Sequence, residues 1–71
     1  MLIDDIAVTV RQYRKLAKLS QQQLAILSGV GKTVIYDIEK AKATIKLSTL
    51  MYVLDTLNIK VILQPPLNKI S

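Results

Sequence analysis

Cysteine and histidine are both missing from this chain of 71 residues. Their absence removes the usual zinc ligands, the thiolate nucleophile and the commonest general base, and it rules out disulfide bonds. The serines lie at expected helix ends, where backbone capping explains them better than nucleophilic chemistry. We therefore expect no enzymatic activity, no metal site, no cofactor and no small-molecule ligand.

Acidic residues and long apolar runs are also scarce. Five Asp and Glu residues stand against ten Lys and Arg residues, which gives a net charge of +5. A positive field of this size attracts polyanions such as nucleic acids, although solubility alone is an alternative explanation. No segment reaches transmembrane length, and the N-terminal stretch with Asp4 and Asp5 lacks the apolar run of a signal peptide. We expect a cytoplasmic protein that does not bind membranes.

Proline occurs only twice, at the adjacent positions Pro65 and Pro66. Because proline has no amide hydrogen, the pair ends whatever element precedes it. Residues 1–64 are therefore predicted to form one domain, followed by a flexible tail at residues 65–71. A chain this short obtains only a few kcal/mol from its own core, which favours association with a second copy.

Apolar residues that recur at three- and four-residue steps predict an all-α fold. The apolar face of the first helix consists of Ile3, Ile6, Val10, Tyr13 and Ala17. A basic stripe lies beside this face and contains Arg11, Arg14, Lys15 and Lys18. Such a stripe on a surface helix is either simply solvated or part of a binding surface.

The two glycines of the chain fall close together and predict a tight turn. Ser20 is a good N-cap for a second helix over residues 21–28, and Gly29 can end this helix in a left-handed conformation. Val30 is then an apolar plug between the flanking helices. Gly31, or the backbone around it, must start the third helix without a side-chain cap.

The third helix has two clearly different faces. Its apolar face consists of Val34, Ile35, Ile38 and Ala41, and its polar face of Lys32, Thr33, Tyr36, Asp37 and Lys40. A face that only contacts solvent would favour Glu and Lys. Short hydrogen-bonding groups, an aromatic ring and cations instead indicate a face that binds a partner.

A fourth helix and one strand complete the predicted fold. Ser48 is the expected N-cap of a helix whose apolar stripe runs from Leu50 to Leu57. Residues 59–63 alternate and are mostly β-branched, which predicts a short strand. A strand needs a neighbour for its backbone hydrogen bonds. That neighbour is either residues 43–46 of the same chain or the same strand of a second copy.

The stretch "LSQQQLAILSGVGKTVIYDIEKAKATIKLSTLMYVLDTL" resembles the XRE, or Cro/C1-type, family of phage-repressor-like helix-turn-helix proteins. The ending "IKLSTLMYVLDTLNIKVIL" is more narrowly similar to HipB-type antitoxins, small repressors paired with a kinase-fold toxin. The resemblance implies a compact, lambda-repressor-like bundle of four to five helices. It also implies a homodimer that binds a palindromic DNA operator, represses its own toxin–antitoxin operon and neutralises a HipA-like toxin.

The same resemblance implies roles for individual residues. The positions that match base-reading residues are Lys32, Thr33, Tyr36 and Asp37. The positions that match phosphate-contacting residues are Gln21, Lys40 and Lys42. The positions that match a structural ion pair are Arg14 and Glu39. The chemistry agrees for Lys32, which can donate to guanine, and for Thr33, which can offer a hydroxyl or a methyl group. Asp37 either accepts from cytosine or orients Lys40 or Lys32, and the alternative role of Arg14 is that of a phosphate ligand.

The chain departs from the family where relatives commonly carry "ExGK". Here the stretch reads Glu39-Lys40-Ala41-Lys42, and because alanine is costlier than glycine in a left-handed conformation, the helix either continues or closes differently. At the other end of the chain, the apolar positions expected in the dimer interface are Leu54, Leu57, Ile59, Val61 and Leu63. A purely intrachain role is their alternative.

Two functional alternatives follow from the same residues. A protein-interaction antitoxin or adaptor would bind a partner protein without reading DNA, and a phage-type repressor would have no toxin. In the first case, the basic residues Arg11, Lys15 and Lys18 would face an acidic protein surface. The polar face of residues 32–40 argues against a hydrophobic docking patch and for DNA.

Overall fold

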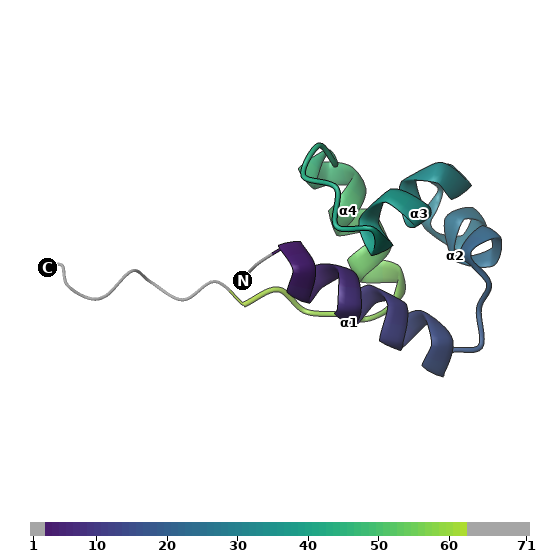
Figure 1. Cartoon of the computed structure of the whole chain (residues 1–71). Coiled ribbons are helices and arrows are strands. Elements are labelled where there is room, and N and C mark those ends of the chain that lie inside the picture. Colours follow the sequence, from purple (N-terminus) through teal and green to yellow (C-terminus); the bar gives the residue numbers. More distant parts are fainter. Residues whose placement is uncertain (1–2, 63–71) are drawn as a thin grey trace, which may run out of the picture.

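Four helices make up the part of the chain that the computed structural model describes, residues 3–62. In chain order they are α1 (Ile3–Leu16), α2 (Gln21–Ser28), α3 (Lys32–Glu39) and α4 (Leu47–Thr56). Figure 1 shows α1 along one side of the bundle and the three shorter helices gathered on the other. The predicted all-α helix-turn-helix bundle is confirmed for these residues. None of their helices is both long and apolar enough to cross a bilayer.

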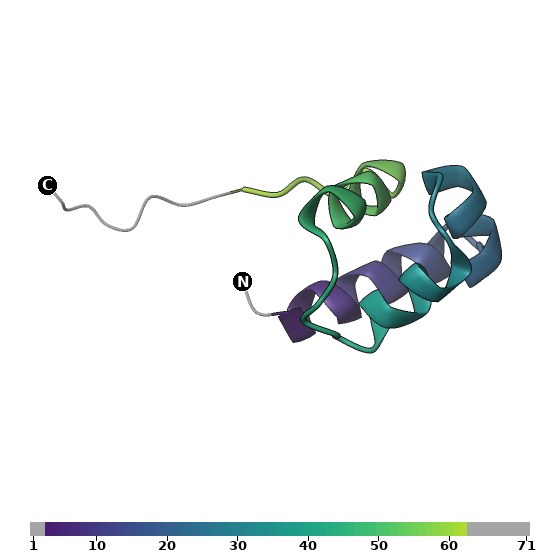
Figure 2. The same ribbon diagram turned by 90° about the horizontal axis from the view of Figure 1, so that it is seen from above.

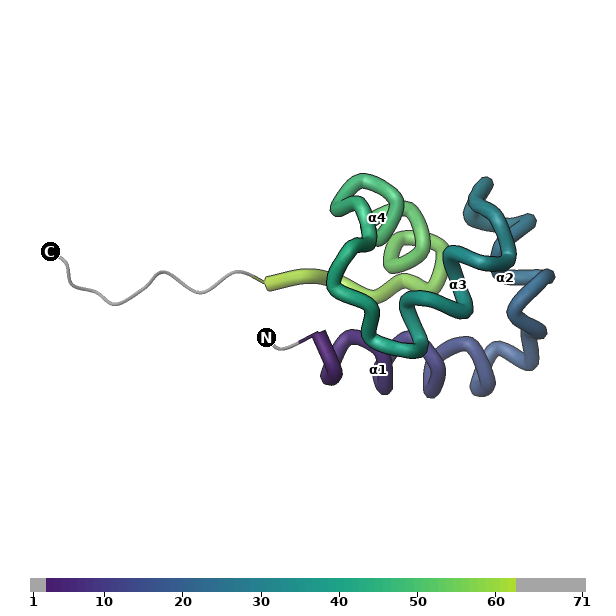
Figure 3. The backbone as a smooth tube through the Cα atoms, turned by 45° about the horizontal axis from the view of Figure 1, so that its top comes forward, coloured from purple at the N-terminus to yellow at the C-terminus, as the bar shows by residue number. Residues whose placement is uncertain are grey.

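The arrangement places α3 in the middle of the bundle. α3 packs against both α1 and α2, and α4 packs against α2. Seen from above, α3 lies alongside α1 (Figure 2). The backbone then leaves the end of α3 and passes through residues 40–46 to α4 (Figure 3). One face of α3 is therefore covered by its neighbours, and the opposite face points away from them.

A single apolar core holds the four helices together. Its most deeply buried side chains are Val10, Leu24, Ile35, Ile38 and Val53. Burial of a Val, Leu or Ile side chain contributes about 1.5–3 kcal/mol to the free energy of unfolding. Because two of the five belong to α3, this helix is fixed in rotation about its own axis, and truncation of Ile35 to alanine should cost about 2–5 kcal/mol.

The buried face of α1 is turned slightly from the one that the sequence predicts. α1 buries Ala7, Val10 and Arg14, whereas Tyr13 is 44% exposed and Ala17 is exposed. The three buried residues follow steps of three and four, as a helix face requires. The prediction missed this face because it assigned Arg14, a charged residue, to the surface.

All four helices end in the same hydrogen-bonded motif. In each, a residue at or directly after the C-cap has a positive φ of 58–73°. The next amide donates to the carbonyl five residues back, as in a Schellman motif. The left-handed residues are Lys18, Gly29, Ala41 and Asn58. The long-range donors are Leu19, Val30, Lys42 and Ile59, at 2.9–3.1 Å from their acceptors. Ala41 thus ends α3 in the conformation that glycine has in the usual family pattern, so the helix does not run on.

The residue that follows the left-handed position is charged after α3 and apolar after the other three helices. In the other three motifs it is apolar and packs against the core, as Leu19, Val30 and Ile59 do. Val30 is therefore the plug that the sequence predicts. After α3 it is Lys42, which is exposed and forms an ion pair of 3.5 Å with Asp37. The end of α3 is consequently the one closed by charge instead of apolar packing.

α4 begins two residues earlier than its sequence suggests. The N-cap is Lys46, with extended backbone and no side-chain hydrogen bond, and the amide of Leu50 donates to its carbonyl at 3.0 Å. Ser48 lies inside the first turn of the helix, so the prediction that it caps α4 is wrong.

Residues 59–62 do not form the predicted strand in the described part of the chain. They form no ladder within the described residues, and of residues 43–46, the expected partner within the chain, residues 43 and 44 form a turn. The physical reason is that a strand requires a neighbouring backbone, which this single chain does not supply. Leu63, the predicted domain boundary at residue 64 and the predicted tail at residues 65–71 lie outside the described residues.

Candidate nucleic-acid interface

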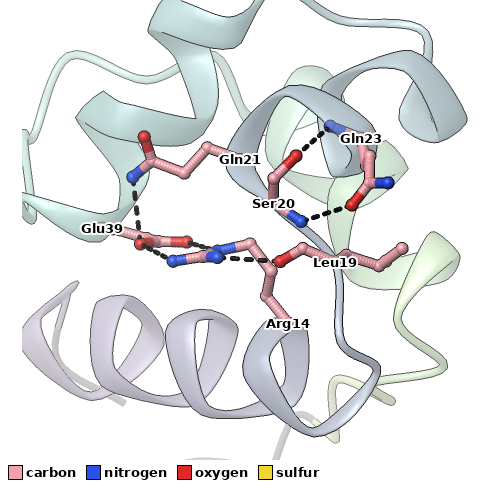
Figure 4. A network of polar contacts seen from close by, with 6 residues as sticks. All are labelled: Arg14, Leu19, Ser20, Gln21, Gln23 and Glu39. Carbon is pink, nitrogen blue, oxygen red and sulfur yellow. Dashed lines mark hydrogen bonds and ion pairs between the residues drawn. The ribbon is translucent and has the colours of Figure 1, made fainter.

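The turn between α2 and α3 fixes the relative direction of these two helices. Ser20 caps α2: its Oγ accepts from Gln23 N at 3.0 Å, and Gln23 Oε1 accepts from Ser20 N at 2.7 Å (Figure 4). At the other end of α2, Gly29 has a φ of 73°, a conformation that costs glycine little. Gly31 then starts α3 without a side-chain cap. The caps and bounds predicted for α2 are confirmed.

The outer face of α3 is open to solvent. Lys32 and Thr33 are exposed, and Tyr36 is 48% exposed, on the side opposite the buried Ile35 and Ile38. A shallow hollow of about 350 Å³ is lined by Gln21, Lys32, Thr33 and Tyr36. The structure therefore brings three of the four predicted base-reading side chains together on a protruding helix face. Their contact with bases stays a prediction.

Arg14 and Glu39, the residues of the expected ion pair, are in direct contact. Arg14 Nε donates to Glu39 Oε2 at 2.6 Å, and Arg14 Nη2 donates to Glu39 Oε1 at 3.0 Å (Figure 4). Arg14 Nη1 also donates to the Leu19 carbonyl at 2.9 Å. The side chains are only 11% and 7% exposed. This fork ties α1 to the end of α3, as expected of the structural ion pair. The alternative role of Arg14 as a phosphate ligand stays a prediction.

The electrostatics of Glu39 follow from these contacts. Burial by itself raises the pKa of the carboxyl group, but hydrogen bonds from Arg14 and Gln21, together with the positive charges of Arg14 and Arg11, outweigh it. The pKa of Glu39 therefore lies below its ordinary value. The hydrogen bond to Glu39 in turn raises the pKa of Arg14. Both groups are charged at neutral pH.

Gln21 has a contact that the sequence did not predict. Its Nε2 donates to Glu39 Oε1 at 3.2 Å, so α2 joins the contact between α1 and α3 (Figure 4). The side chain is half-buried at the first position of α2. Sequence spacing gives no signal for this hydrogen bond, because it depends on the angle between α2 and α3. The predicted phosphate contact of Gln21 is untested, and its side chain now has a structural role as well.

The remaining polar residues of α3 are arranged around its C-terminal end. Asp37 pairs with Lys42 at 3.5 Å, so its cation is neither Lys40 nor Lys32, the two that sequence considerations offered. Lys40 Nζ lies 5.5 Å from the centre of the Tyr36 ring, within range of a cation–π contact. An aspartate already paired with lysine is a weaker candidate for base contact than Lys32 or Thr33.

The comparison with known protein families agrees with this geometry. A helix-turn-helix family model matches residues 10–63. The chain belongs to the helix-turn-helix family. It is 41% identical over 56 residues to the control protein C.SmaI of Serratia marcescens, a match that covers 79% of this chain and 67% of that protein. It is 37% identical over 62 residues to an uncharacterized HTH-type transcriptional regulator, y4mF, of Sinorhizobium fredii, with 87% and 82% covered.

In this helix-turn-helix chain, the expected dimer residues divide into two groups. Leu54 and Leu57 are buried in the core of the subunit, which is the intrachain role that the sequence left open. Ile59 is half-buried against the same core, and Val61 is 38% exposed. Leu63 is outside the described residues. Among the four described residues of this predicted interface, Val61 is therefore the one most exposed for contact with another molecule.

The segment of residues 59–62 borders a further hollow, away from α3. The hollow measures about 610 Å³ and is lined by Met51, Asp55, Asn58, Ile59, Lys60, Val61 and Ile62. Ile62 is 79% exposed and Met51 37% exposed at its edge. The exposed apolar side chains of this hollow therefore belong to α4 and to the residues that follow it, and not to α3.

Proposed function

We propose that the protein is a sequence-specific DNA-binding transcriptional repressor. α3 enters the major groove, where Lys32 donates to guanine and Thr33 contacts a neighbouring base edge. Tyr36 lines the same side of the helix. The observation that carries the proposal is the exposed outer face of α3, held in orientation by the buried Ile35 and Ile38.

The proposed repressor acts as a homodimer on a two-fold operator. One α3 reads only a few base pairs, whereas two copies read half-sites about one helical turn, roughly 34–36 Å, apart or a multiple of it. The support for a second copy is the apolar hollow beside residues 59–62, where extended backbone can pair with its own copy across a two-fold axis. Asp55 and Lys60 in that hollow also make it self-complementary in charge.

Binding of duplex DNA by the parent chain and by a double variant tests sequence reading. The variant is Lys32→Ala with Thr33→Ala, and the control is Gln12→Ala with Lys15→Ala, which removes one charge and one polar group from exposed positions of α1. Fluorescence anisotropy is measured with the upstream region of the gene and with a scrambled duplex. The first variant should lose discrimination by about 1–3 kcal/mol per lost bidentate contact, and the control should retain it.

Equal discrimination by the parent and the Lys32/Thr33 variant would refute specific reading by α3. No binding of either duplex at low salt would favour the adaptor alternative, in which the chain binds only a partner protein. For a DNA binder with six to ten phosphate contacts, affinity should fall about 10³- to 10⁵-fold between 50 and 200 mM salt.

The narrower antitoxin role depends on the resemblance of the chain ending to HipB-type proteins. The two relatives are named as a control protein and as a transcriptional regulator. The apolar side chains of Ile59, Val61 and Ile62 are compatible with either role. Co-purification with a kinase-fold protein encoded beside this gene would support the antitoxin role, and a solitary gene would favour a repressor without a toxin.

A further inference from the structure

A second polar hollow lies where α1, α2 and α3 meet. It measures about 190 Å³ and is lined by Arg11, Arg14, Gln21, Tyr36, Glu39 and Lys40. It shares Gln21 and Tyr36 with the hollow that contains Lys32 and Thr33. The two hollows therefore adjoin along the side of α3, one beside the predicted base-reading residues and one beside α1.

The charges around this second hollow do not cancel. Arg14 binds both carboxylate oxygens of Glu39, so these two opposite charges compensate each other. Arg11 and Lys40 are both exposed and add two positive charges to the same hollow. Arg11 lies close enough to Glu39 for its charge to help lower the pKa of that carboxyl. An anion that enters the hollow meets two cations that the protein has not neutralised.

The position of the hollow selects the kind of anion. A helix in the major groove is flanked by phosphates, and these supply half or more of the hydrogen bonds in protein–DNA interfaces. A cationic hollow that adjoins the groove-facing side of α3 is placed to meet one of these phosphates. Arginine also matches phosphate geometry with two parallel donors.

We propose that Arg11 and Lys40 together bind one backbone phosphate in this hollow, an inference that rests on the proposed DNA binding. Arg11 is thereby separated from the other cations of the α1 stripe. Lys15 lines a different and mainly apolar hollow with Gln12, Tyr13 and Leu16. Lys18 lies beyond α1, at the left-handed position that follows it. Arg11 is a phosphate ligand that positions the protein on the duplex, and it carries no base preference.

Two variants with the same charge change test the role of Arg11. Arg11→Gln and Lys15→Gln each remove one positive charge from an exposed site of α1. Anisotropy titrations between 50 and 200 mM salt are made with the upstream duplex and with a scrambled one. Each phosphate contact contributes about 0.9 to the slope of log affinity against log salt. Arg11→Gln should lower that slope by about one and weaken both duplexes about tenfold near 0.1 M salt, with their ratio unchanged.

Removal of single phosphate charges identifies the contact itself. Methylphosphonate is placed at one position at a time in the upstream duplex. For the parent, one position in each half-site should give a loss of about tenfold. The loss at that position should be clearly smaller in Arg11→Gln, where Lys40 alone still contacts the phosphate. Lys15→Gln should show the same loss as the parent. Thermal unfolding of both variants checks that the fold is unchanged.

The outcomes separate this site from the proposed function. If the parent reads DNA but Arg11→Gln has the parent slope and the parent loss at every methylphosphonate, the phosphate site is wrong and the repressor is not. If DNA binding is unchanged while Arg11→Gln loses affinity for an acidic protein partner, the hollow is a protein contact. If the parent binds neither duplex, the phosphate site is refuted together with the proposed function.

Discussion

The ends of α2 and α3 have the same backbone geometry and different chemistry. Each closes with a left-handed residue, Gly29 after α2 and Ala41 after α3. After α2, Val30 packs into the core. After α3, Lys42 pairs with Asp37 on the surface, and Glu39 pairs with Arg14 inside the bundle. The first end is held by glycine and apolar packing, and the second by two ion pairs.

This difference relates to where the two ends lie. Val30, which follows the end of α2, packs against the core, where an apolar residue gains the most from burial. The end of α3 borders the polar hollows, where the charges of Lys40 and Lys42 remain on the surface. Alanine at positive φ makes the end of α3 less stable than glycine would. The ion pair that closes this end keeps a cation near the DNA phosphates in the proposed complex.

The largest effect is expected from the buried pair at the end of α3. Glu39→Gln leaves Arg14 buried without its counter-charge and should lower the free energy of unfolding by about 3–5 kcal/mol. That loss is comparable to the whole stability expected of a domain of this size. Urea denaturation followed by circular dichroism measures it.

The partner substitution sharpens this result. Arg14→Met combined with Glu39→Leu should be less destabilising than either single change, because no buried charge is left unpaired. A double variant as unstable as the sum of the two single variants would contradict the assigned coupling.

Acid should weaken the same contact. The pKa of Glu39 is lowered in the folded state, so its contribution to stability is fully present above the unfolded value of about 4.3 and is lost as pH falls through the folded pKa. The protein should therefore unfold at lower urea as the pH falls below about 4.3. In urea denaturation followed by circular dichroism, the parent should lose more stability over this pH range than Glu39→Gln. Equal losses would contradict the role of Glu39.

Exchange of glycine and alanine at the two left-handed positions, 29 and 41, should change the free energy of unfolding in opposite directions. Gly29→Ala should lower the free energy of unfolding by about 1–2 kcal/mol, from backbone conformation alone, because no atom lies within 4 Å of the added Cβ. Ala41→Gly should raise it by about 0.5–1 kcal/mol. Thermal denaturation compares both with the parent, and changes of the same sign would refute the common geometry.

The smallest effect on stability is expected at the surface pair. Asp37 and Lys42 are 24% and 58% exposed in their side chains, so Asp37→Asn should cost less than about 1 kcal/mol and less still at high salt. The same change removes a negative charge beside the proposed phosphate contacts. Affinity for a scrambled duplex should therefore rise a few-fold, and a fall in affinity would place Asp37 against the DNA as an acceptor.

Much of the helix-turn-helix could be predicted because its signals are local. Ser20 and Gly29 mark the two ends of α2, and the two faces of α3 follow from helical spacing. The contact between Arg14 and Glu39 came from family resemblance, since the residues are 25 positions apart. These features depend either on neighbouring residues or on a pattern shared with relatives.

The parts that were missed depend on packing between helices. The hydrogen bond from Gln21 to Glu39 and the place of Arg11 in the second hollow require the angles between α1, α2 and α3. The face of α1 was misjudged because Arg14 occupies a buried position. The strand predicted at residues 59–63 needs a second backbone, so a single sequence cannot decide it.

The most direct test of the central claim uses the absence of cysteine from the chain. Thr33→Cys and, as control, Gln12→Cys each carry one photoactivatable crosslinker, and each is irradiated with the upstream duplex. The account predicts crosslinks from position 33 to bases in two half-sites about one helical turn apart, or a multiple of it, and none from position 12. Crosslinks from position 12 alone would show that α3 is not the helix that enters DNA.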